Sequence, residues 1–245
     1  MLGDLSLRLL GAFVKKGDVT IDVGANLGVY AYELARLVGR GGRVHAFEPD
    51  PGTIGRLTAM SHSLPQITVH AMAASDHAGE MTLHVPVLRE KRIGALASLV
   101  PPAQSAAGEY ENVAVRVERI DTVLSQMSGV ALVKIDVEGH EMPVLRGAEG
   151  TLRRHRPALM IEIEQRHIEV EIATTFAYIG SLGYDGYAIG PQGIFPLSEF
   201  DVRRDQLAFL DGRFVATGLP RAYVNNFLFV RSGSRVDDLP RQRAR

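Results

Sequence analysis

The chain of 245 residues has no cysteine, almost no net charge and no apolar run long enough to cross a membrane. The absence of cysteine excludes a disulfide framework, a zinc–thiolate site and a thiol nucleophile, and it is compatible with a reducing cytosol. A formal net charge of −1 provides no broad positive field for nucleic acid. We therefore expect a cytoplasmic enzyme or binding domain that uses neither nucleic acid nor a membrane.

A hydrophobic content of 46% is enough for a sizeable core, and we expect residues 1–245 to form a single domain. Residues 1–18 are expected to contribute an amphipathic N-terminal helix, because apolar side chains recur at helical spacing at Leu2, Leu5, Leu9 and Phe13. Residues 231–245 carry several arginines without apolar periodicity, which predicts a flexible basic tail. Homo-oligomer formation stays open.

Short apolar runs alternate with helix-like segments from Val19 onward. Strands are expected at 19–23, 43–47, 67–73, 130–136, 157–164 and 223–230. Helices are expected near 27–38, 53–63, 141–153 and 170–182. This alternation is typical of βαβ units and predicts an α/β fold with a mostly parallel sheet.

The middle of the chain departs from this rhythm. The segments "GEMTLHV" (79–85) and "NVAVRVER" (112–119) alternate with a period of two, which predicts two extra or edge strands. Between them, residues 86–111 are rich in proline, alanine and glycine. We interpret this insertion as a mobile lid over a site.

Carboxylates stand at or just after the ends of four expected parallel strands, at Asp22, Glu48, Asp76 and Asp136, with Glu138 close by. Each one alone is more often a helix cap than a ligand. In doubly wound sheets, however, ligands bind outside the carboxyl ends of the strands, so the row of acids favours a site at this edge.

The segment "DVGANLG" predicts a tight turn from the first strand into a helix, with Gly24 and Gly28 leaving backbone N–H groups free at the helix start. A dinucleotide-binding turn would read G-x-G-x-x-G, but Asn26 stands at its second glycine. Asp22, directly before the turn, would repel a pyrophosphate and attract an ammonium or a sulfonium. S-adenosylmethionine fits this turn better than NAD does. Glu48 is then expected to accept the ribose hydroxyls, and Asp76 the adenine amino group.

Two motifs resemble the FkbM family of S-adenosylmethionine-dependent methyltransferases. One is "IDVGANLGVYAYELA" followed by "VHAFEPDP", and the more specific one is "LVKIDVEGHEMPVLRGAEGTL" leading into "RPALMIEIE". The resemblance implies a Rossmann-like class I methyltransferase fold, with a seven-stranded, mostly parallel sheet, an antiparallel last strand and helices on both faces. It also implies O-methylation of a small-molecule, sugar or polyketide hydroxyl. The cofactor site would contain Asp22, Gly24, Asn26, Glu48 and Asp76. Residues 86–111 match no motif of the family.

An alcohol is a poor nucleophile, so a proton acceptor should lie near the transferred methyl group. We expect Asp136 and Glu162 to orient the acceptor and His140 to be a candidate general base. Lys134, inside a strand covered on both faces, is expected to form a structural pair with a carboxylate. Glu164 is expected to lie at the surface.

Two other functions stay open from the residues alone, an NAD-dependent dehydrogenase or epimerase and a nucleotide-binding module without catalytic activity. The carboxylates at the strand ends could hold Mg²⁺, but no fixed spacing marks a metal site. The histidines are scattered along the sequence, which argues against zinc. We therefore predict no metal.

Overall fold

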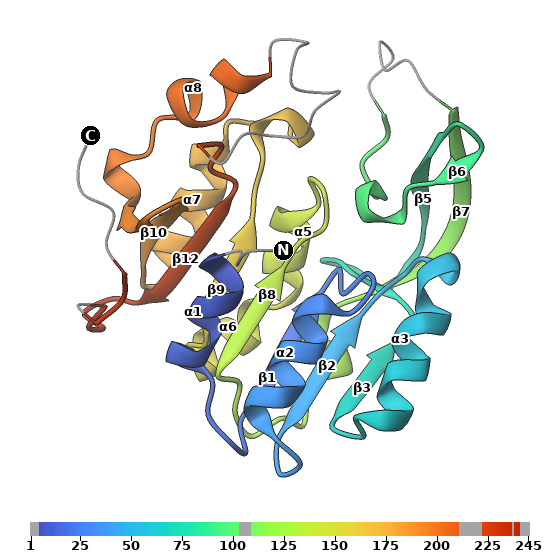
Figure 1. Cartoon of the computed structure of the whole chain (residues 1–245), viewed down its shortest axis with the longest axis horizontal. Coiled ribbons are helices and arrows are strands. Elements are labelled where there is room, and N and C mark those ends of the chain that lie inside the picture. The colour runs from blue at the N-terminus through green and yellow to red at the C-terminus, as the bar shows by residue number, and fades with distance from the viewer. Residues whose placement is uncertain (1–4, 103–108, 211–221, 237, 241–245) are drawn as a thin grey trace.

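The computed structural model describes residues 5–102, 109–210, 222–236 and 238–240. Its main sheet has eight strands in the order β11-β10-β12-β9-β8-β1-β2-β3 (Figure 1). The five strands β3, β2, β1, β8 and β9 are parallel, and β12 and β10 continue the sheet with antiparallel pairings. The strands are β1 Val19–Val23, β2 Arg43–Phe47, β3 Ile67–His70, β8 Leu132–Ile135, β9 Ala158–Glu162, β10 Tyr184–Gly190, β11 Gly193–Pro196 and β12 Asn226–Arg231.

The expected Rossmann-like sheet with an antiparallel last strand is confirmed. One strand more is present than the seven expected. The additional strand, β11, folds back on β10 as a hairpin in which Gly190 pairs with Gly193. It extends the edge of the sheet opposite β3 and leaves the parallel part unchanged.

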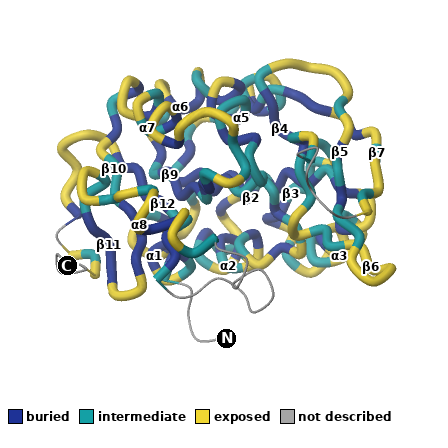
Figure 2. Tube along the Cα trace, turned by 90° about the horizontal axis from the view of Figure 1, so that it is seen from above, coloured by how far each residue is buried: buried dark blue, intermediate teal, exposed yellow. Residues whose placement is uncertain are grey.

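Helices cover both faces of this sheet because its central strands are apolar on both sides. Ile21 and Val23 pack on one face against helices α4 to α7, whereas Val44 and Ala46 pack on the other against α1 to α3. Buried residues accordingly run along the strands in Figure 2. The helices are α1 Leu5–Phe13, α2 Val29–Val38, α3 Pro51–Ser63, α4 Ile120–Val123, α5 Glu141–Gly147, α6 Glu149–His155, α7 Ile172–Ser181 and α8 Val202–Asp205.

A second sheet of four strands, in the order β4-β7-β5-β6, stands beside the main one at the upper right of Figure 1. It contains β4 Ala73–Ala74, β5 Gly79–Leu88, β6 Lys91–Arg92 and β7 Glu109–Glu118. The two extra strands are therefore confirmed, but they pair with each other, from Gly79 opposite Val117 onward, and do not extend the main sheet. They have an apolar core of their own around Leu83, Val85 and Leu99.

Arg92 anchors this second sheet to helix α3 through an ion pair. Its Nη2 lies 2.9 Å from Oδ1 of the buried Asp50, which caps α3, and its Nε lies 2.6 Å from Oε2 of Glu111. The expected lid at 86–111 is thus anchored at β6 in its described part, and residues 103–108 lie outside the described residues.

Both ends of the described chain pack on the domain. Leu9 and Leu10 of α1 are buried, as the apolar spacing predicts for Leu9. The segment after β12 differs from a fully solvated tail, because Val236 is buried and the Ile194 N–H donates to the Pro240 carbonyl at 2.7 Å. No helix in the described ranges is both long and apolar enough to span a bilayer.

Candidate functional site

The turn after β1 is shaped by a close backbone approach. Gly24 has φ of +77°, and a Cβ there would lie 1.8 Å from the Asp136 carbonyl oxygen, so no side chain fits. The N–H groups of Gly24 and Ala25 both donate to the Phe47 carbonyl at 3.0 Å. Asn26 follows with φ of +48°. The turn is therefore held between the ends of β2 and β8.

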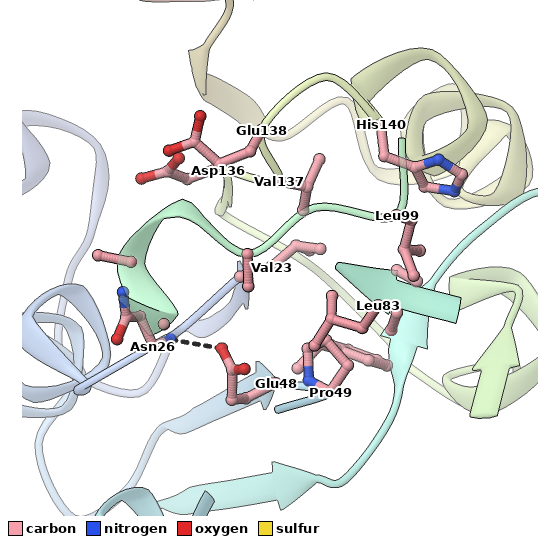
Figure 3. Close-up of a pocket in the computed structure, with 17 residues that line it drawn as sticks. Val23, Asn26, Glu48, Pro49, Leu83, Leu99, Asp136, Val137, Glu138 and His140 are labelled. Atoms are coloured by element: carbon pink, nitrogen blue, oxygen red, sulfur yellow. Dashed lines mark hydrogen bonds between the residues drawn. The ribbon is translucent and has the colours of Figure 1, made fainter. Parts of the chain in front are cut away.

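Glu48, directly after β2, has its carboxylate fixed by two backbone donors. Its Oε2 accepts the Asn26 N–H at 2.7 Å, as Figure 3 shows, and its Oε1 accepts the Asp50 N–H at 2.8 Å. Burial raises the pKa of Glu48, and these two N–H groups oppose the rise. The carboxylate is thus positioned before any ligand arrives, with lone pairs left to accept hydroxyl groups.

These groups line a cavity that we call the strand-end pocket, with an empty volume of about 610 Å³ including its open mouth. This volume is typical of a small-molecule site. The ends of β1, β2 and β8 form one side, and β4 and β5 of the second sheet with the residues after β6 form the other. Its lining consists of Val23, Gly24, Asn26, Phe47, Glu48, Pro49, Ala73, Ala74, Leu83, Gly94, Ala95, Ala97, Leu99, Asp136, Val137, Glu138 and His140 (Figure 3).

Asp22 lies beneath the turn and does not line this pocket. It is buried, it accepts a hydrogen bond from the Ala31 backbone, and its Oδ2 has no hydrogen-bond partner among the described residues. Burial raises its pKa to about 7, while Lys134 opposes that rise. A buried acceptor without a donor is what a carboxylate awaiting a cationic group would show.

Gly28 and Asp76 also lie outside the lining. Gly28 begins α2 with φ of +84°, and a Cβ there would lie 2.8 Å from Met60 Cε, so this glycine serves helix packing. Asp76 Oδ1 lies 2.8 Å from Nδ1 of His77, and its side chain is 35% exposed. Between β3 and β5 the pocket wall is made by Ala73 and Ala74.

Lys134 forms the expected structural pair with a carboxylate. Its side chain is 1% exposed, and its Nζ lies 3.5 Å from Asp136 Oδ2 and 4.9 Å from the centre of the Tyr30 ring. Burial alone would lower the pKa of Lys134, but Asp136, Tyr30 and neighbouring carboxylates raise it above its usual value. Lys134 is therefore a fixed positive charge and not a base.

A small cavity, which we call the carboxylate cavity, lies beside the strand-end pocket. It is lined by Asp136, Glu138, Gly139, Glu141, Glu162, Glu164 and His167. Burial, followed by the charge of Asp136, raises the pKa of Glu162 to about 8. Asn225 Nδ2 donates to Glu162 Oε1 at 2.6 Å. The structure thus brings Asp136 and Glu162 together, as expected.

The expected surface position of Glu164 is wrong. Its side chain is only 4% exposed and accepts hydrogen bonds from the Tyr223 hydroxyl at 2.5 Å and from Arg166. Tyr223 and Asn225, which hold these glutamates, precede β12 and are far away in the sequence. Alternation along one strand could not predict partners from the segment that precedes β12.

In Figure 3, His140 stands on the other side of the strand-end pocket from the carboxylates of Asp136 and Glu138. Its Nε2 lies 3.0 Å from the Ser75 hydroxyl, and burial lowers its pKa to about 4. At neutral pH it is an uncharged, weakly basic imidazole. Among the described residues, no group of three or more His, Asp or Glu is arranged to hold a metal ion.

Comparison with known proteins places this geometry in a family. Residues 22–185 match the family model described as "Methyltransferase FkbM domain". Hexuronic acid methyltransferase AglP of Haloferax volcanii is 27% identical over 60% of this chain and 56% of its own length. The 31-O-demethyl-FK506 methyltransferase FkbM of Streptomyces tacrolimicus is 31% identical over 57% of this chain and 62% of its own. The chain therefore matches little more than half the length of each relative.

Solved structures agree on the fold. A methyltransferase FkbM from Methylobacillus flagellatus superposes with a TM-score of 0.53 at 17% identity, over 88% of this chain and 43% of that one. Aeropyrum pernix fibrillarin, solved with bound S-adenosyl-L-methionine, superposes with a TM-score of 0.50 at 14% identity, over 92% of this chain and 73% of that one.

Proposed function

Because the chain belongs to the FkbM methyltransferase family, whose cofactor is S-adenosylmethionine, we propose that it methylates a hydroxyl oxygen of a small-molecule, sugar or polyketide acceptor. Family membership sets aside the NAD-dependent dehydrogenase or epimerase. The observation that carries the hydroxyl assignment is the carboxylate cavity beside the strand-end pocket, because an alcohol needs a group that receives its proton. A thiol or an amine acceptor would depend less on such a group.

The residues of the strand-end pocket fit the cofactor. Gly24 lets the turn approach the Asp136 backbone closely, and Glu48 has acceptor capacity for two hydroxyl groups. Beneath the pocket, Asp22 Oδ2 is a buried acceptor without a donor in the described chain. We propose that Glu48 holds the ribose and that Asp22 attracts the positively charged end. When bound, the cofactor supplies an electrophilic methyl group. We also propose that Asp76 accepts a hydrogen bond from the adenine amino group, although its side chain lies outside the lining of the strand-end pocket.

The chain's own residues would then align and deprotonate the acceptor. We propose that Asp136, which lines both the strand-end pocket and the carboxylate cavity, orients the acceptor hydroxyl together with Glu162. Holding the oxygen in line with the methyl group supplies much of the rate enhancement. His140 is a candidate base, but its low pKa makes it a weak one.

Incubation with S-adenosylmethionine and an extract of the producing cells tests the function. We expect mass spectrometry to find a product one methylene heavier than its precursor, with the new methyl group on oxygen. Asp136→Asn should retain cofactor affinity and slow the transfer. Methylation of nitrogen or carbon would contradict the hydroxyl assignment, and cofactor binding without any transfer would favour a module that has lost its activity.

A further inference from the structure

A second cavity lies on the other side of the segment that closes the strand-end pocket. It encloses about 970 Å³ of empty space including its mouth. Its walls come from the second sheet, from residues 96–102 and from the η2 turn, Gln165–His167, with the residues that follow. Nothing in the family comparison assigns it a ligand. Its lining combines apolar Pro101, Tyr110 and Ile168 with ionisable Arg166 and Glu169.

Residues 94–100, which we call the partition, separate the two cavities. Ala97 and Leu99 line the strand-end pocket, whereas Ser98 and Val100 line the second cavity, so the extended chain presents alternate side chains to each. Backbone hydrogen bonds between Ser98 and His84 hold the partition against β5, at 2.8 and 3.1 Å. Groups in the two cavities can meet at a point that lines both of them.

That point is Glu138. Among the described residues it alone lines both the strand-end pocket and the second cavity, and it lines the carboxylate cavity as well. The Ser98 hydroxyl donates to the Glu138 carbonyl at 2.6 Å, which fastens the partition to this position. In Figure 3 the carboxylates of Glu138 and Asp136 point the same way.

The backbone holds Glu138 in an unfavourable conformation. Its φ is +51°, in the left-handed region that residues with a side chain seldom adopt, and the next residue, Gly139, has φ of +101°. A Cβ on Gly139 would lie 2.4 Å from the His167 carbonyl oxygen. The turn is thus pressed against η2, and strain of this kind is typically retained at functional positions.

We infer that the methyl acceptor binds in the second cavity and that the Glu138 carboxylate receives the proton of its hydroxyl. This inference rests on the proposed function. The hydroxyl oxygen forms the new bond to the methyl carbon, the carbon–sulfur bond breaks with its electron pair left on sulfur, and the proton passes to Glu138. His167 Nε2 lies 3.1 Å from Glu138 Oε2, without hydrogen-bond geometry between them.

Charge supports both parts of the inference. Arg166 is balanced by the buried Glu164, which leaves the second cavity without an excess of positive charge. An uncharged hydroxylated compound therefore suits this cavity better than a phosphate or a carboxylate. Burial, then Asp136 and other carboxylates, raise the pKa of Glu138 to about 8, which makes it a far stronger base than an exposed glutamate. The charged and titratable groups that face it are Asp136, Glu141, Glu162, Glu164, Arg166 and His167.

The first test measures binding and needs no acceptor. Calorimetry compares S-adenosylmethionine with S-adenosylhomocysteine at about pH 6 and about pH 9 for wild type, Glu138→Gln and Glu171→Gln. Glu171 is an exposed carboxylate outside the three cavities. In the wild type, the ratio of the affinity for S-adenosylmethionine to that for S-adenosylhomocysteine should rise on the order of tenfold from about pH 6 to about pH 9, as Glu138 loses its proton. Glu138→Gln should lose the share of this growth that Glu138 causes, while Asp22 and Glu162, which also lose protons in this range, keep the remainder. Glu171→Gln should keep all of it. Full retention in Glu138→Gln overturns the position assigned to Glu138.

The second test measures transfer to methyl glucopyranoside, methyl glucuronoside and 31-O-demethyl-FK506. Glu138→Gln should lower kcat on the order of a hundredfold or more, with little change in KM. The wild-type rate should rise with pH through about 8, and the variant should lack that rise. The neutral glucoside should be methylated faster than the glucuronoside, and the reverse order overturns the uncharged acceptor.

The two tests separate the inference from the function on which it rests. Wild-type transfer with an unaffected Glu138→Gln overturns the role of Glu138 and leaves the proposed function standing. If the wild type methylates no hydroxyl while the binding preference follows Glu138, the hydroxyl acceptor is wrong and the position of Glu138 is supported.

Discussion

Replacing Glu48 by alanine is the most direct test of the cofactor site. The substitution removes the acceptor of two backbone donors, the N–H groups of Asn26 and Asp50, and also the group proposed to bind the ribose. A pair of charge-assisted hydrogen bonds to a ligand contributes about 2–3 kcal/mol of binding free energy. This corresponds to an affinity for S-adenosylhomocysteine that is about 30- to 140-fold weaker.

The same substitution should lower the stability of the cofactor-free protein only moderately. Because the strand-end pocket opens to solvent, water can reach the two N–H groups, and we expect a loss of about 1–2 kcal/mol in the free energy of unfolding. For a chain of this length the melting temperature should fall by about 2–8 °C. Isothermal titration with S-adenosylhomocysteine, at a temperature where the variant is folded, separates binding from stability.

Two matched variants complete this experiment. Glu48→Gln keeps the side-chain length and one acceptor oxygen, so its affinity should lie between those of the wild type and Glu48→Ala. Glu80→Ala removes an exposed carboxylate of β5 and should bind as the wild type does. If Glu48→Ala binds the ligand within about threefold of the wild type, the ribose assignment is refuted, since threefold is far below the effect of two charged hydrogen bonds.

Three further predictions concern the surroundings of the site. Gly24→Ala should abolish detectable cofactor binding and lower the melting temperature, because the new Cβ would collide with the Asp136 backbone. The control Gly55→Ala has open space around it in α3 and should melt at the same or a higher temperature. Arg92→Ala should lower the free energy of unfolding by about 1–2 kcal/mol and speed proteolysis of the second sheet. Lys91→Ala, at the exposed neighbouring residue, should change neither the stability nor the rate of proteolysis. Finally, four buried carboxyls have folded-state pKa values raised from about 4 to about 7 or 8, so the unfolded state loses their protons first as pH rises. The melting temperature of the cofactor-free protein should therefore fall between about pH 4 and pH 8, and an unchanged or rising value would contradict their burial. The four carboxyls are Asp22, Glu138, Glu141 and Glu162.

The main sheet was predictable because its signals are local. An apolar run buried on both faces, a glycine turn and a helix each depend on neighbouring residues, so β1, β2, β8 and β9 follow from the sequence pattern. Glu48 was predictable for the same reason, as the acid that closes β2. The geometry at Gly24 was predictable in kind, although its contact with the Asp136 backbone depends on how β1 and β8 pair.

The role proposed for Glu138 was not predictable from its own neighbourhood. Its importance depends on the partition, which reaches it only because β5 and β7 pair with each other and carry residues 94–100 across the strand ends. Pairing between distant segments leaves no mark in the local period of a sequence. The burial of Glu164 escaped prediction for the same reason, because Tyr223 approaches it from the far end of the chain.

The charges buried at the strand ends are the physical reason for proposing a cationic ligand at this turn. Six carboxyl groups gather there around two fixed positive charges, Lys134 and Arg166, and burial makes each unbalanced negative charge costly. The six are Asp22, Asp136, Glu138, Glu141, Glu162 and Glu164. Raised pKa values mean that four of these carboxyls compensate in part by holding protons. A ligand with its own positive charge can replace those protons, whereas a diphosphate would add to the excess. We propose that the acids around it redirect the turn, which dinucleotide-binding folds share, to a sulfonium.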